Sequence, residues 1–125
     1  MRILFLCQRG GAKSVIAASY FNRLAAERDL PFVATAAAAE DPYDAVPDPV
    51  VHHLQRDGFD VRAFKPQHVD AGELETAAKI VAIDCDVPAA NERWDDVPKV
   101  SDDLEGAAAA IRRHVETLVD DLDDH

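Results

Sequence analysis

MRILFLCQRGGAKS, residues Met1 to Ser14, is the stretch that decides the fold. Ile3 to Leu6 form an apolar run without polar alternation, which predicts a buried parallel strand. Cys7 follows, and then a short segment with Gly10 and Gly11, in which the backbone can curl and direct successive N–H groups toward one spot. From Ser14 onward, apolar residues recur at helical spacing, so the segment leads directly into a helix whose positive N-terminal end faces the same spot.

This order of elements gives Cys7 a chemical role. A helix N-terminus and neighbouring cations favour the thiolate form of a cysteine, which is the nucleophilic form. The inward N–H groups would hold the oxygens of a tetrahedral oxyanion such as phosphate above the sulfur. The predicted oxyanion-binding residues are Gln8, Arg9, Gly10, Gly11 and Ala12.

The spacing of Cys7, five residues, a basic residue and Ser14 resembles the signature loop of the low-molecular-weight protein tyrosine phosphatases and of the arsenate reductases that share their fold. The resemblance implies a three-layer α/β sandwich of the phosphotyrosine protein phosphatase I type. Its four-stranded parallel sheet, in the order 2-1-3-4, is flanked by helices. Within the signature loop, the chain departs from the family at two positions. Lys13 stands where the family has arginine, and Gly10 where it has asparagine.

The resemblance also implies roles for the loop residues. Cys7 is the nucleophile, forming a phosphocysteine or a thiol-arsenate intermediate, and Ser14 donates its hydroxyl to the thiolate. Lys13 neutralises the oxyanion, with Arg9 assisting if its side chain turns inward. Lysine offers a point charge where arginine offers a planar fork, so the alternatives are a weaker transition-state clamp and a module that binds anions without turnover. Tyr43 is expected to form a wall of the pocket.

A phosphatase also needs an acid that protonates the departing oxygen. The family places an aspartate before a proline in the loop after the last strand, and Trp94-Asp95-Asp96-Val97-Pro98 resembles that segment. Asp96 is the first candidate and Asp95 the second. Asp102 is a third, although with Glu105 it is more typical of the cap of the last helix.

Cys85 separates the two chemistries of the family. In the thioredoxin-coupled arsenate reductases, two further cysteines follow the third strand and carry the oxidation out of the site as a disulfide. Cys85 stands near the first of these positions, while Glu92 and Arg93 occupy the region of the second. Arsenate reduction would therefore use Cys85 as a single resolving thiol, or would need thioredoxin or a low-molecular-weight thiol as partner.

Composition limits the other function classes. The chain has 125 residues, which we interpret as one domain, 1–125, and 24 acidic against 13 basic residues give a net charge of −11. This charge argues against nucleic acid or an anionic membrane as partner and favours a small anionic substrate at the local cations Arg9 and Lys13: a phosphate monoester, a phosphoprotein or arsenate. With two cysteines, no metal-ligand spacing and no signal or membrane segment, we expect a cytoplasmic protein without metal or other cofactor.

The remaining chain alternates predicted strands and helices, which favours a parallel α/β sheet. Residues 32–37 are expected as a strand, although their alanines suit a helix equally well. Asp48-Pro49 predicts a helix start, with the aspartate as cap, and Asp70 with Glu73 predicts a capping box. Residues 79–84 form the clearest later strand, a last short strand is expected within 94–98, and apolar spacing predicts a final helix through residues 107–122.

Overall fold

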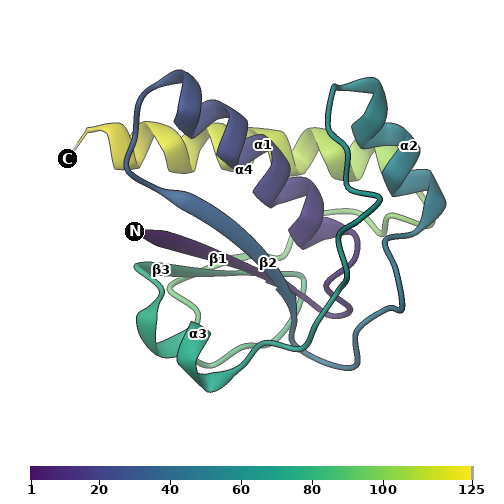
Figure 1. Ribbon diagram of the computed structural model, residues 1–125, viewed down its shortest axis with the longest axis horizontal. Coiled ribbons are helices and arrows are strands. Elements are labelled where there is room, and N and C mark those ends of the chain that lie inside the picture. Colours follow the sequence, from purple (N-terminus) through teal and green to yellow (C-terminus); the bar gives the residue numbers. More distant parts are fainter. Residues whose placement is uncertain (125) are drawn as a thin grey trace.

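The computed structural model describes residues 1–124 and contains one parallel sheet in the order β2-β1-β3-β4 (Figure 1). The strands are β1 (Arg2–Cys7), β2 (Val33–Ala38), β3 (Lys79–Ile83) and β4 (Glu92–Trp94). The predicted architecture and strand order are confirmed. β1 lies between β2 and β3, and Ile3 to Leu6 are fully buried, as their uninterrupted apolar run requires.

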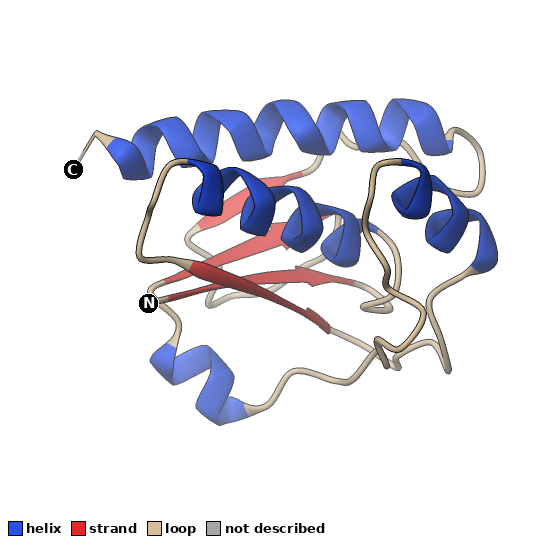
Figure 2. Cartoon of the chain, turned by 45° about the horizontal axis from the view of Figure 1, so that its top comes forward, coloured by secondary structure: helices blue, strands red, loops and turns tan. Residues whose placement is uncertain are grey.

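Helices cover the two faces of the sheet unequally. Figure 2 shows α1 (Lys13–Glu27), α2 (Asp48–Arg56) and α4 (Leu104–Asp123) above the sheet and the short α3 (Ala71–Thr76) below it. Alternate residues of β1 serve the two faces, because strand side chains point to opposite sides. Phe5 packs against Phe21 and Trp94 on the side of α1, with ring centroids 5.8 and 5.5 Å away, whereas Leu4 and Leu6 face the smaller cluster with α3.

Cys7, the last residue of β1, belongs to the same side as Phe5. Its thiol therefore lies on the face of the sheet where α1 begins. Parallel strands bring their carboxyl ends to one edge of the sheet, where open α/β sheets bind ligands. The segment after β2 follows the loop after β1 closely: the N–H groups of Ala39 and Glu40 donate to the carbonyls of Cys7 and Gln8, each at 2.9 Å.

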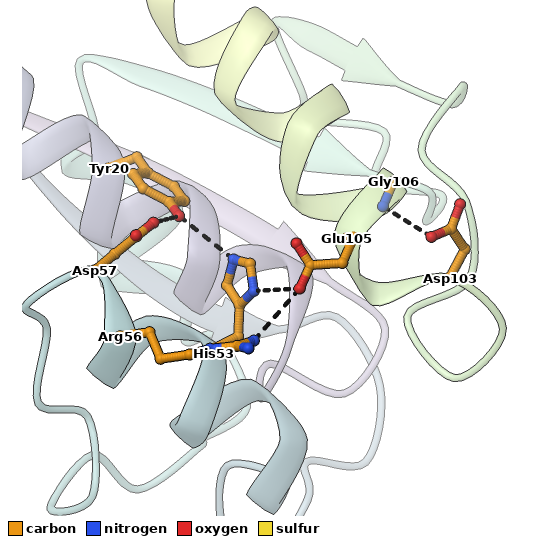
Figure 3. A network of polar contacts seen from close by, with 7 residues as sticks. All are labelled: Tyr20, His53, Arg56, Asp57, Asp103, Glu105 and Gly106. Atoms are coloured by element: carbon orange, nitrogen blue, oxygen red, sulfur yellow. Dashed lines mark hydrogen bonds and ion pairs between the residues drawn. The ribbon is translucent and has the colours of Figure 1, made fainter.

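Three predicted element boundaries are corrected. Pro47, not Asp48, is the N-cap of α2, so that Asp48 lies in its first turn. β4 begins before the tryptophan and ends at it, rather than lying within 94–98. Asp103, not Asp102, caps α4, with its carboxylate accepting from the Gly106 N–H at 2.9 Å (Figure 3). The predicted strand at residues 32–37 and the capping box of Asp70 and Glu73 are confirmed.

Two features are absent from residues 1–124. None of the helices described there is long and apolar enough to cross a membrane. Nor does this part of the chain bring together three or more His, Cys, Asp or Glu side chains in a group that could hold a metal ion.

Candidate active site

The Cys7 thiol and the Ser14 hydroxyl are in contact in the interior. Cys7 Sγ lies 3.1 Å from Ser14 Oγ, and the backbone N–H of Ser14 donates to the same sulfur at 3.4 Å. Ser14 is fully buried in the first turn of α1, and Cys7 is 5 % exposed. The first turn of α1 thus places one backbone donor and one hydroxyl, which can donate or accept, against the same sulfur atom.

The backbone of the loop offers further donors. Among residues 1–124, no backbone N–H from Gln8 to Lys13 donates a hydrogen bond to another protein atom. The carbonyls on the opposite side of the same peptides are occupied, since those of Cys7, Gln8 and Arg9 accept from the segment after β2. A row of free N–H groups at the start of a helix is the arrangement that binds tetrahedral anions.

Gly10 makes this loop conformation possible. Its φ of +67° lies in the left-handed region, and a Cβ at this position would come within 2.7 Å of the Ala38 backbone nitrogen. Asparagine tolerates the left-handed region but still carries a Cβ, so glycine here allows the loop to lie against the end of β2 more closely than asparagine would.

Lys13 extends along the edge of the sheet. Its ammonium group donates to Asp84 Oδ2 at 2.8 Å and to the carbonyl of Val97 at 3.4 Å. The Lys13 side chain is 11 % exposed, whereas that of Asp84 is 47 % exposed. The cation predicted to meet the oxyanion is therefore held by a carboxylate 71 residues away in sequence. The sequence signal for Asp84 was its place directly after the buried strand β3.

The loop opens into a cleft of about 620 Å³. Cys7, Gln8, Arg9, Ala12 and Lys13 contribute to its lining. One further part of the wall comes from Tyr43 and the start of α2, and another from residues 99–102 and Leu104. The Arg9 guanidinium lies 5.8 Å from the centroid of the Tyr43 ring and donates to the carbonyl of Asp41 at 3.5 Å, so Arg9 is at the rim of the cleft rather than on its floor.

Solved structures of other proteins are similar to the structure of this chain. No protein-family model matches the sequence, and no curated protein matches it. The structure of YfkJ from Bacillus subtilis has a TM-score of 0.88 at 18 % identity, and the match covers 99 % of this chain and 95 % of the YfkJ chain. A low-molecular-weight phosphotyrosine phosphatase from Vibrio cholerae O395 has a TM-score of 0.82 at 17 % identity, with 97 % and 95 % covered. The chain has the low-molecular-weight phosphatase fold.

The same fold includes enzymes of another chemistry. An arsenate reductase from Archaeoglobus fulgidus has a TM-score of 0.73 at 25 % identity and covers 98 % of this chain and 99 % of its own. The fold alone is thus compatible with two reactions, hydrolysis of phosphate esters and reduction of arsenate. The positions of the candidate acids and of the second thiol bear on the choice between them.

Asp96, the first candidate for the acid, lies outside the cleft. Its carboxylate pairs with His114 of α4 at 2.7 Å, and the His114 ring stacks on Trp94 with centroids 4.7 Å apart. The hydrogen bond from His114 lowers the pKa of Asp96, which opposes a role as proton donor. Asp95 pairs with Arg93 at 3.5 Å and is also absent from the cleft lining. Asp96 therefore pairs with α4 instead of lining the cleft, and its role as the acid stays a prediction.

Asp102 occupies the place that Asp96 was expected to fill. It is exposed and lines the cleft together with Ser101 and Lys99. Because Asp103 caps α4, the Asp102 carboxylate is not needed for the cap. In this phosphatase fold, Asp102 is thus the aspartate of the loop after β4 that faces the same cleft as Cys7.

Cys85 is placed poorly for a relay of oxidation. It belongs to the cluster on the α3 side of the sheet, whereas Cys7 belongs to the opposite side, and its thiol donates to the carbonyl of Leu6 at 3.5 Å. Burial, followed by the nearby Cys7, raises the pKa of the Cys85 thiol to about 11. A raised pKa favours the protonated thiol, which is the less reactive form, and the role of Cys85 as resolving cysteine stays a prediction.

Proposed function

We propose that this chain hydrolyses phosphate monoesters through a phosphocysteine intermediate on Cys7. One observation carries the proposal: the thiol that accepts from the Ser14 N–H and contacts the Ser14 hydroxyl lies beside a row of backbone N–H groups that have no partner among residues 1–124, at the floor of an open cleft. Nucleophile and oxyanion donors are the two parts that displacement at phosphorus requires at one place.

In the first step, the Cys7 thiolate attacks phosphorus, the S–P bond forms and the bond to the ester oxygen breaks. Asp102 gives its proton to the departing oxygen, which leaves as an alcohol or phenol. The N–H groups of residues 8–13 and the Lys13 ammonium hold the nonbridging oxygens, whose charge must be stabilised in the transition state.

In the second step, Asp102 takes a proton from water, the water oxygen attacks phosphorus and the S–P bond breaks. Inorganic phosphate leaves, and the thiolate returns to its contact with the Ser14 hydroxyl. Ser14 stabilises the sulfur in both steps, because it donates to the charge that is lost on attack and regained on release.

The cleft favours esters with an apolar, flat leaving group. Tyr43, 42 % exposed, Pro47 and Pro49 present apolar surface on its wall, and Val100 and Leu104 also contribute. Burial of apolar area contributes binding free energy in proportion to the area covered, so we expect aryl phosphates to be better substrates than small alkyl phosphates.

Arsenate reduction is the second candidate, favoured by the 25 % identity to the arsenate reductase from Archaeoglobus fulgidus. Reduction of arsenate to arsenite oxidises two thiols, of which Cys7 would supply one. Because Cys85 is buried on the other side of the sheet, the second would come from thioredoxin or a low-molecular-weight thiol.

The test is hydrolysis of an aryl phosphate by the wild type and by three variants. We expect turnover that Cys7→Ser abolishes, that Ser14→Ala lowers by about 10²-fold, the effect of removing one oxyanion donor elsewhere, and that Ser19→Ala leaves unchanged. Ser19 is a matched control, because it lies in the same helix with its hydroxyl bonded to the carbonyl of Val15. Arsenate-dependent consumption of an added thiol without hydrolysis would favour the second candidate. Phosphate binding without either reaction would contradict both.

A further inference from the structure

The Lys13 ammonium has a defined number of donors left for a ligand. An ammonium group carries three N–H donors, and here one is given to Asp84 and one to the carbonyl of Val97. One N–H remains for the oxyanion. A lysine held by two fixed acceptors loses the rotational freedom that makes the side chain a poor clamp by itself.

The backbone at Asp84 places its carboxylate for this contact. β3 pairs with β1 in parallel from Ile3 with Lys79 to Leu6 with Ala82, so the residues after β3 come to lie beside the loop after β1. Asp84 has a φ of 51°, in the left-handed region, which is unfavourable for a residue that carries a Cβ. Its N–H donates to the carbonyl of Trp94 at 2.9 Å. The turn is thus held by β4, and Asp84 lies in the lining of the cleft with its carboxylate on Lys13.

A carboxylate in an anion-binding cleft would repel the substrate if it acted alone. Its charge is compensated by the Lys13 ammonium 2.8 Å away. We propose that Asp84 is a positioning residue that holds the Lys13 ammonium where its remaining N–H meets the oxyanion in the transition state. The proposal rests on the function proposed above, and it assigns to Asp84 the geometric control that the planar fork of arginine supplies by itself.

The first experiment separates kcat from KM in Asp84→Asn with an aryl phosphate. Asparagine keeps an acceptor but loses the charge, so Lys13 is held less firmly while the cleft becomes less negative. We expect kcat to fall about tenfold, in the range for a misplaced catalytic group, and KM and the inhibition constant of inorganic phosphate to stay equal or fall. Asp86→Asn removes the same charge two residues away, from a carboxylate that pairs with Arg93 outside the cleft. The Asp86→Asn substitution should change kcat, KM and the inhibition constant of phosphate by no more than about twofold each.

The second experiment asks whether Asp84 acts through Lys13. In the background of Lys13→Met, adding Asp84→Asn should lower kcat no further, because no ammonium is left to hold. The same fold loss in both backgrounds would overturn the proposal, as would an unchanged kcat in Asp84→Asn or a raised KM and phosphate inhibition constant.

The third experiment does not depend on turnover, so it distinguishes failure of this proposal from failure of the proposed function. NMR of protein with ¹⁵N-labelled lysine, assigned with Lys13→Met, reports how slowly the Lys13 ammonium protons exchange with water. We expect slow exchange in the wild type and in Asp86→Asn, and exchange as fast as that of the exposed Lys65 in Asp84→Asn. Fast exchange in the wild type, or slow exchange in Asp84→Asn, would contradict the holding contact.

Discussion

At the scale of single residues, Gly10 and Gly58 both have a positive φ but differ in the space around them. Comparing the two positions separates the cost of backbone strain from the cost of a steric clash. Gly10 has a φ of +67° and a wall of β2 backbone and side chain within 3 Å of the place of a Cβ. Gly58 has a φ of +90° and nothing within 4 Å of that place. The two positions demand the same kind of backbone, but only one of them excludes the side chain.

We expect Gly58→Ala to cost about 1 kcal/mol of unfolding free energy, the cost of the left-handed conformation alone. Gly10→Ala should cost about 2–3 kcal/mol, because a clash with β2 is added to the strain, and it should abolish phosphate binding by displacing the loop. Urea unfolding monitored by circular dichroism measures both, and phosphate titration measures the second. Equal costs for the two substitutions would show that the loop moves away from β2 without penalty.

At the scale of elements, the start of α4 divides two tasks between neighbouring aspartates. Asp103 caps the helix through the Gly106 N–H, and Asp102 lines the cleft (Figure 3 for Asp103). Asp103 holds the helix end and Asp102 lines the cleft. Substitution of Asp103 should therefore lower stability, and substitution of Asp102 should lower activity.

Asp103→Ala should lower the unfolding free energy by about 1 kcal/mol, the value of an N-cap. Asp102→Ala should leave stability within about 0.5 kcal/mol and lower kcat by about 10²-fold, the contribution of a general acid. The loss should be larger for alkyl than for aryl phosphates with good leaving groups, because good leaving groups need less protonation. An unchanged kcat in Asp102→Ala would remove Asp102 from the mechanism.

At the scale of the whole molecule, one polar network joins the three helices above the sheet. Tyr20 of α1 donates to Asp57 at the end of α2, and its oxygen lies 3.4 Å from His53 Nε2 (Figure 3). His53 in turn lies 3.3 Å from Glu105 of α4. Burial, followed by the hydrogen bond to Asp57, raises the pKa of Tyr20 to about 12 from its ordinary value of 10.

The sign of the resulting pH dependence follows from proton binding. Between pH 10 and 12, the unfolded chain releases the Tyr20 proton while the folded chain keeps it, so the stabilisation is complete below pH 10 and is lost as the pH rises through 12. Urea unfolding across this range should therefore show a smaller loss of stability in Tyr20→Phe than in the wild type. Parallel curves for the two proteins would contradict the network as a source of stability.

Much of the fold could be predicted because its signals are local. The buried strand β1, the glycine turn and the helix from Lys13 follow from an apolar run, two glycines and helical spacing within about 25 residues. The capping box of Asp70 and Glu73 is equally local. Cys7 and Ser14 come together for the same reason, since the loop and helix that bring them together are built from the residues between and beside them.

The surroundings of the candidate acids and the partner of Lys13 were decided by the tertiary structure. Asp96 pairs with His114 of α4, whereas Asp102 lines the same cleft as Cys7. Asp84 reaches Lys13 only because β3 lies beside β1. A carboxylate is the same group in any loop, and its role depends on which distant cation it meets. The sequence by itself determined the loop from Cys7 to Ser14, because that loop is one continuous segment, and the pairing of strands and helices determined the charges around it.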